Sequence, residues 1–168
     1  MVPINQINIQ FFKTKVAEFI LGSFDGKLCL LDFRYRRMRG TIDKRLQKGL
    51  GAEFVERDND ILQMARTQID EYFLGSRQDF DLPLLLVGSD FQKSVWNGLM
   101  QVPYGSTSSY LELARQVDQV KAVRPVAAAN GGIKRDPLTG EDILEEPCSR
   151  FTITEPGLMT PAEYDAAM

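Results

Sequence analysis

A tight turn near residue 118 constrains the fold of this chain most, because helical patterns stand directly on both sides of it. Ser109 and Glu112 have the Ser-x-x-Glu spacing of a capping box, which predicts the start of a short helix. Asp118-Gln119 predicts a tight turn, and residues 120–132 predict a second short helix that ends at Asn130 and Gly131. Helix, tight turn and helix together indicate a helix-turn-helix.

The second helix of this pair has an unusual composition. Ala127, Ala128 and Ala129 give it a slim surface, and Arg124 places one charged side chain near its start. A slim helix can approach the narrow minor groove of DNA, where an arginine can act among the stacked bases. Equally, three alanines permit close packing against another helix, and the pattern alone leaves both interpretations open.

The N-terminal part of the sequence predicts an antiparallel sheet covered by a helix. Residues 18–33 read as a hairpin around Asp25-Gly26, a dipeptide that supplies the positive φ angles of a two-residue turn. Residues 7–15 predict a third strand. From Asn59 apolar residues recur at helical spacing, and Gly75 marks the end of that helix.

The segment before Asp90 reads as a connection, which predicts two domains. We expect an α+β domain at 1–87 and a helical domain at 88–168. The run Arg34–Lys48 is the most basic of the chain, and we interpret it as a solvated strand end and loop, with a basic binding face as the alternative.

Composition excludes several classes of protein. Two cysteines cannot form a disulfide framework, and a chain without histidine is a poor candidate for a zinc site, so no metal and no cofactor are expected. Cys29 lies among leucines of the predicted hairpin and is interpreted as a core thiol. A net charge of −3 argues against indiscriminate coating of nucleic acid. We expect a cytoplasmic protein that does not enter a membrane, because the chain opens without an apolar leader and no apolar run approaches the roughly 20 residues of a span.

The stretch DFQKSVWNGLMQVPYGSTSSYLELARQVDQVKAVRPVAAANG, followed by PCSR at 147–150, resembles the O6-alkylguanine-DNA alkyltransferases. These proteins are also called methylated-DNA–protein-cysteine methyltransferases. The family form runs D-F-Q-x-x-V-W, then P-Y-G-x-T-x-S-Y, then K-A-V-R-A-V-x-x-A-N and P-C-H-R. The N-terminal hairpin and residues 69–84 are also similar to the family, so the resemblance extends over about three-quarters of the chain.

The resemblance implies a protein that repairs double-stranded DNA containing O6-alkylguanine and acts as a monomer. It implies an α+β fold, with a ribonuclease H-like N-terminal domain and a winged-helix-like domain that inserts its helix-turn-helix into the minor groove. The alkylated base would be flipped out and its alkyl group moved irreversibly to Cys148. Tyr110 matches the tyrosine that assists flipping, and Arg124, fourteen residues later, matches the arginine that fills the vacated stack. Ala127 and Ala128 match recognition-helix positions that contact DNA.

The sequence departs from the family pattern around the cysteine. Ser149 stands where the family has histidine, and a serine hydroxyl cannot act as a base near neutral pH. Arg150 favours the thiolate, whereas Glu145 and Glu146 disfavour it. Residues 131–168 as a whole diverge, since the glycine-rich loop expected after the cysteine is absent. Loss of the histidine would slow the transfer without necessarily abolishing it, because an unperturbed thiol with a pKa of ~8.5 is already a few per cent thiolate at pH 7.

Three functional hypotheses follow from these residues. The first is an alkyltransferase that uses Cys148 as acceptor. The second is a non-enzymatic module that binds alkylated DNA, and the third is a degenerate, inactive chain whose C-terminus has been replaced after Gly131.

Overall fold

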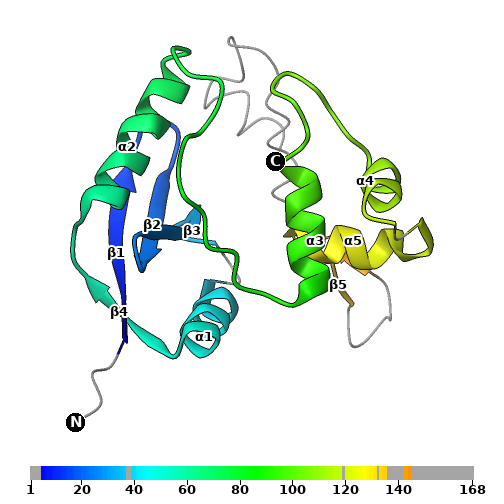
Figure 1. Cartoon of the computed structure of the whole chain (residues 1–168), viewed down its shortest axis with the longest axis horizontal. Coiled ribbons are helices and arrows are strands. Elements are labelled where there is room, and N and C mark those ends of the chain that lie inside the picture. The colour runs from blue at the N-terminus through cyan, green and yellow to red at the C-terminus, as the bar shows by residue number, and fades with distance from the viewer. Residues whose placement is uncertain (1–4, 37–38, 119, 132, 136–141, 145–168) are drawn as a thin grey trace. The chain divides into compact units, whose positions relative to one another are not determined.

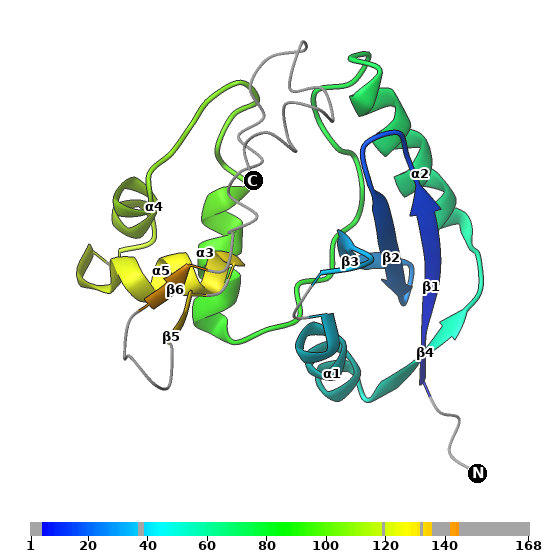
Figure 2. The same cartoon turned by 180° about the vertical axis from the view of Figure 1, so that it is seen from behind.

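The computed structural model describes residues 5–36, 39–118, 120–131, 133–135 and 142–144. The chain divides into two compact units, residues 1–88 and 89–168, and each unit is described by itself. Figures 1 and 2 show the first as a sheet with helices and the second as a set of short helices.

The first unit is built on a mixed four-stranded sheet. Its strands are β1 (Asn5–Lys13), β2 (Glu18–Phe24), β3 (Lys27–Phe33) and β4 (Ala52–Glu56), in the order β3-β2-β1-β4. The three antiparallel strands predicted from the sequence are confirmed. The predicted strand count is wrong by one, because β4 adds parallel to β1, from Asn5 opposite Ala52 to Ile9 opposite Glu56. Both glutamates of β4 face away from the core, so this strand lacks the long apolar run that would have predicted it.

The β2–β3 hairpin turns as its sequence predicts and then contains a bulge. Asp25 and Gly26 both have positive φ, 47° and 68°, and Phe24 pairs directly with Lys27. The register shifts between Gly22 and Ser23, which leaves Cys29 as the extra residue of β3. As a result, Leu28 and Leu30 on either side of Cys29 enter different core clusters.

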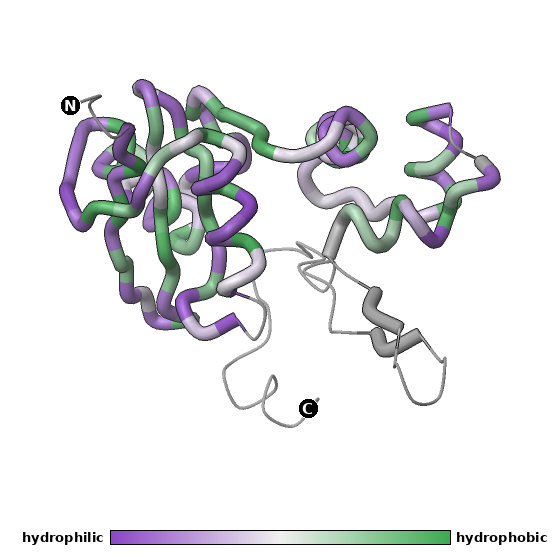
Figure 3. The backbone as a smooth tube through the Cα atoms, turned by 90° about the horizontal axis from the view of Figure 1, so that it is seen from below, coloured by the Kyte–Doolittle hydropathy of each residue, from purple (hydrophilic) through white to green (hydrophobic). Residues whose placement is uncertain are grey.

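Two helices cover opposite faces of the sheet (Figures 1 and 2). Helix α1 (Arg39–Leu50) buries Leu46 against Ile7 and Ile20, whereas α2 (Asp60–Phe73) buries Leu62 against Leu21. Full burial of one such side chain stabilises the fold by about 1.5–3 kcal/mol. Figure 3 shows hydrophobic and hydrophilic residues interleaved along this unit, as expected for elements that each bury one side.

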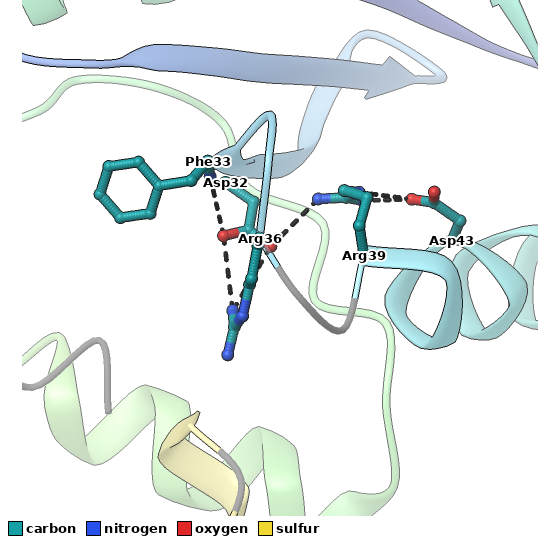
Figure 4. A network of polar contacts seen from close by, with 5 residues as sticks. All are labelled: Asp32, Phe33, Arg36, Arg39 and Asp43. Atoms are coloured by element: carbon teal, nitrogen blue, oxygen red, sulfur yellow. Dashed lines mark hydrogen bonds and ion pairs between the residues drawn. The ribbon is translucent and has the colours of Figure 1, made fainter. Parts of the chain in front are cut away.

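Helix α1 takes up residues 39–48 of the basic run that was interpreted as a strand end and loop, so that interpretation is wrong for this part of the run. Its start belongs to a polar group that we call the Asp32 cluster: Asp32, Arg36, Arg39 and Asp43 (Figure 4). Asp32 accepts hydrogen bonds from the guanidinium of Arg39 at 3.0 Å, from that of Arg36 at 3.4 Å, and from the backbone N–H of Phe33 at 2.8 Å. Arg39 also binds Asp43 one turn along the helix. The basic residues here are therefore partly neutralised within the fold.

Within its described residues, the second unit contains three short helices and a small two-stranded sheet. The helices are α3 (Asp90–Leu99), α4 (Tyr110–Gln116) and α5 (Val123–Gly131), with a 3₁₀ turn η1 (Val120–Ala122) directly before α5. Strands β5 (Ile133–Arg135) and β6 (Asp142–Leu144) pair antiparallel. One apolar core joins the helices, made of Val95 from α3, Leu113 and Ala114 from α4, and Val126 from α5.

None of the helices in the described ranges is long and apolar enough to span a bilayer.

Candidate functional site

The first helix of the predicted helix-turn-helix begins where its capping box indicated. The hydroxyl of Ser109 accepts the backbone N–H of Glu112 at 3.1 Å, and the Glu112 carboxylate accepts the backbone N–H of Ser109 at 2.7 Å. The pKa of Glu112 is lowered, first by the hydrogen bond from the backbone N–H of Ser109 and then by a hydrogen bond between the carboxylate and the Ser109 side chain. Both N–H donors would otherwise lack a partner at the start of the helix, so the capping box fixes the point at which α4 begins, with Tyr110 as its first residue.

The turn between the two helices needs a left-handed residue. Helix α4 ends at Gln116 with Val117 as its C-cap, and Asp118 has a φ of 56°. Aspartate adopts this conformation more readily than most residues, because its short polar side chain tolerates the left-handed region. The chain then enters η1 and α5, which confirms the predicted helix, tight turn and helix.

The face of α5 is divided between core and surface. Val126 and Ala127 are buried, at 0% and 6% exposure, whereas Arg124 and Ala128 are exposed. Pro125, where the family pattern quoted above has alanine, is also exposed. Proline is tolerated there because it lies in the first turn, where a backbone N–H has no helical partner.

The predicted site residues thus fall into three groups. Tyr110 is partly buried and packs against the core that holds α4 and α5 together, while Arg124 and Ala128 lie on the surface of α5. Ala127 faces the core, which is the packing role left open by the sequence. The thiol residues Cys148, Ser149 and Arg150 lie outside the described residues.

Helix α3 carries contacts that the sequence did not predict. The indole N–H of Trp96 donates to the backbone carbonyl of Ala129 in α5 at 3.0 Å. The N-cap of α3 is Ser89, which forms a second capping box with Gln92. The Ser-x-x-Gln spacing was the available signal for that cap.

An open hollow of about 420 Å³ lies between the start of α3 and the exposed part of α5. Its lining contains Ser89, Phe91, Gln92, Pro125, Ala128 and Ala129. Across the described ranges, no three or more cysteine, aspartate or glutamate side chains gather in a way that could hold a metal ion.

Comparison with protein families assigns both units. Residues 9–86 match the ribonuclease-like domain, and residues 90–150 the DNA binding domain, of 6-O-methylguanine DNA methyltransferase. The second match runs through residue 150 and so includes Cys148.

Individual proteins give the same result. A Methylated-DNA--protein-cysteine methyltransferase of Methanosarcina barkeri is 37% identical over 138 residues, which cover 82% of this chain and 77% of the relative. The constitutive enzyme of Bacillus subtilis is 43% identical over 89 residues, covering 53% of this chain and half of the relative's length.

Solved structures of relatives agree with the fold. The crystal structure of Mycobacterium tuberculosis OGT in complex with DNA superposes with a TM-score of 0.60 at 27% identity, covering 74% of this chain and 68% of the other. The O6-methylguanine methyltransferase of the same organism gives 0.59 at 28% identity, with 74% and 70% covered. The chain therefore belongs to the 6-O-methylguanine DNA methyltransferase family of DNA repair alkyltransferases, which is the enzyme class methylated-DNA–protein-cysteine methyltransferase.

Proposed function

We propose that this chain repairs double-stranded DNA by moving the alkyl group of O6-alkylguanine to its own Cys148. The observation that carries the proposal is the exposed face of α5, where Arg124 and Ala128 lie on a helix held against capped α4. This unit is the part of the chain that matches the DNA binding domain of the family.

DNA contact follows from the shape and charge of that face. With Ala128 exposed, the backbone of α5 can come close to a partner at this position. Arg124 adds a cation and a flat guanidinium that can stack where a base has left the duplex. A base must leave, because the alkyl carbon of a paired guanine cannot be reached inside the stack. Tyr110, at the first position of α4, is assigned to assist that step.

The transfer itself is a displacement at carbon. The Cys148 thiolate forms a carbon–sulfur bond with the alkyl carbon as the bond between that carbon and O6 of guanine breaks. The electron pair stays on the guanine and is neutralised by a proton. A thiolate suits this step because it is a soft nucleophile and needs no cofactor. Ser149 supplies no base, so Arg150 is the neighbouring residue whose charge favours the thiolate.

The test is transfer of label from DNA to protein. A duplex with one O6-methylguanine labelled in the methyl group is incubated with excess protein, which is then isolated under denaturing conditions. We expect at most one methyl group per protein molecule, none in Cys148→Ala, and unchanged transfer in Cys29→Ala. Cys29 is a matched control, because it is the other of the two cysteines of the chain and lies in the N-terminal unit.

Label that persists in Cys148→Ala would refute Cys148 as acceptor. No transfer, together with tighter binding to the alkylated duplex than to the plain one, would favour a non-enzymatic binding module. No transfer and no preference would refute the proposal entirely.

A further inference from the structure

Trp96 joins α3 to the last turn of α5 by a directional bond. Its indole N–H donates to the carbonyl of Ala129 at 3.0 Å, across 33 residues of sequence. Helix α5 ends at Gly131, so the carbonyl of Ala129 lies in the last turn, where no later N–H of the helix can reach it. The indole therefore supplies a donor that the helix itself cannot.

Other contacts of α3 restrain the helices less specifically. Val95 packs with Leu113 and Val126, and apolar contacts of this kind are non-directional. Gly98 brings α3 close to α4, because a Cβ at this position would lie 2.8 Å from Leu113 Cδ1 and 2.9 Å from Val117 Cγ1. Packing thus sets the spacing of the helices, whereas a hydrogen bond also restricts angle.

The hollow beside α5 makes that restriction more important. Phe91 and Gln92 of α3 and Pro125 and Ala128 of α5 line open space, so packing holds Pro125 and Ala128 less closely than it holds the buried Val126. A rotation of α5 about its axis by one residue, roughly 100°, would exchange exposed and buried positions. It would carry Arg124 and Ala128 away from the surface they now share.

We propose that Trp96 is a positioning residue for DNA recognition, whose indole N–H fixes the end of α5 and thereby the direction in which Arg124 and Ala128 face the duplex. This inference rests on the proposed function, because it assumes that α5 contacts DNA. Trp96 itself touches no substrate in this mechanism.

The composition of the chain allows a test at a single atom. Trp96 is its one tryptophan, so replacing the tryptophan codon alters this residue alone. Benzothienylalanine keeps the shape of the two-ring side chain and has sulfur in place of the N–H. 5-Fluorotryptophan keeps the N–H and is the matched control. Both proteins are prepared as the full chain.

We expect the benzothienyl protein to bind a duplex containing O6-methylguanine about tenfold more weakly, the effect of losing one hydrogen bond. The fluorotryptophan protein should bind as the unsubstituted protein does. Transfer from O6-benzylguanine as a free base should proceed at the same rate in all three proteins, because a free base does not need α5 to be aligned with a duplex. A general loss of structure would lower both the duplex binding and the free-base transfer.

Equal binding of the duplex by the benzothienyl and fluorotryptophan proteins would overturn the inference. A loss of free-base transfer as large as the loss of duplex binding would overturn it too. The unsubstituted protein gives an independent measurement through its single indole N–H resonance. Slow exchange of that proton with solvent supports the bond to Ala129, and exchange as fast as that of free tryptophan overturns it. Unsubstituted protein that neither binds nor repairs alkylated DNA, yet protects its indole N–H, refutes the proposed function and leaves the bond itself intact.

Discussion

The two units of the chain use polar side chains differently. In the N-terminal unit, charged groups bind one another: Asp32 with Arg36 and Arg39, and Asp58 with Arg66 at 2.7 Å. In the C-terminal unit, several of the described polar contacts bind side chains to the ends of helices, as Ser109 and Glu112 do at α4 and Trp96 does at α5.

This difference indicates a division of roles. Charges that neutralise each other within a fold contribute to its stability and leave little for a charged partner. Bonds that fix helix ends instead determine the direction in which exposed residues such as Arg124 face. We therefore expect changes in the first unit to alter stability, and matched changes in the second unit to alter DNA binding.

The largest effect should come from Asp32→Asn. The Asp32 side chain is 7% exposed and that of Arg39 is 14% exposed, so the change removes the buried carboxylate that the guanidinium groups of Arg36 and Arg39 share, and leaves Arg39 with Asp43. Burial, and then the charges of Arg36 and Arg39, already lower the pKa of neighbouring Arg45, whereas the charge of Asp32 raises it. Loss of the Asp32 charge therefore increases the repulsion among these three arginines. We expect the unfolding free energy of this unit to fall by about 3 kcal/mol, as when one partner of a buried pair is removed.

Urea unfolding followed by two signals can localise that loss. Fluorescence of the single tryptophan reports the C-terminal unit, whereas far-ultraviolet circular dichroism reports both units. Only the dichroism transition should shift in Asp32→Asn. Asp58→Asn is the control, because the Asp58–Arg66 pair is 39% and 24% exposed and should be worth less than about 1 kcal/mol. Equal losses in the two variants would remove the distinction between the buried and the exposed pair.

The second effect is expected in binding rather than stability. Arg124→Ala should weaken binding to the alkylated duplex by about 1–3 kcal/mol, because it removes the guanidinium from the DNA-facing surface. Its unfolding free energy should change by less than about 0.5 kcal/mol, as for other surface substitutions. Arg115→Ala removes the same charge from an exposed position on α4 and should weaken DNA binding less than Arg124→Ala does. Its main effect should be a smaller dependence of binding on salt concentration. Equal losses would show that charge alone matters, not its position on α5.

The sequence predicted local structure at positions where the backbone itself demands a particular type of residue. The turn at Asp25-Gly26, the capping box at Ser109 and the turn at Asp118 are all confirmed. In each case a backbone conformation or an unpaired N–H requires that residue, whatever the surroundings.

Contacts between distant segments escaped prediction. Strand β4 pairs with β1 in parallel, and no local pattern in Ala52–Glu56 indicates that partner. The Asp32 cluster joins residues on both sides of a strand end, and one of its two carboxylates, Asp32, lies outside the basic run, so the run alone did not indicate that pairing. The bond from Trp96 to a backbone carbonyl leaves no trace in the sequence of α5. The role of Cys148 stays a prediction, since it lies outside the described residues.

A smaller effect is expected at the cap of α4. Ser109→Ala removes the hydroxyl that accepts the N–H of Glu112, and should lower the unfolding free energy of the C-terminal unit by about 1 kcal/mol. The pKa of Glu112 is lowered in the folded protein, so its contribution is present above the ordinary value of 4.5 and is lost as pH falls through the folded value. Urea unfolding followed by tryptophan fluorescence at pH 7 and at pH 4 measures both the loss of unfolding free energy in Ser109→Ala and its dependence on pH. A transition that weakens in Ser109→Ala only when followed by dichroism would place the cap's effect outside this unit.

The smallest effect concerns Cys29, which the fold keeps protonated. Burial raises the pKa of this thiol to about 11, and its Sγ–H donates to the carbonyl of Gly22 at 3.4 Å. Above pH 9 the unfolded chain loses this proton while the folded protein retains it, so stability should fall as pH rises toward 11 and remain unaffected below 9. In Cys148→Ala protein, reaction of Cys29 with iodoacetamide at pH 8 should be about a hundredfold slower when folded than in urea, which follows from the thiolate fractions at pKa values of about 11 and 9.0. Similar rates in the two states would mean that the bulge of β3 leaves the thiol open to solvent, and the N-terminal unit would then hold a reactive group of its own.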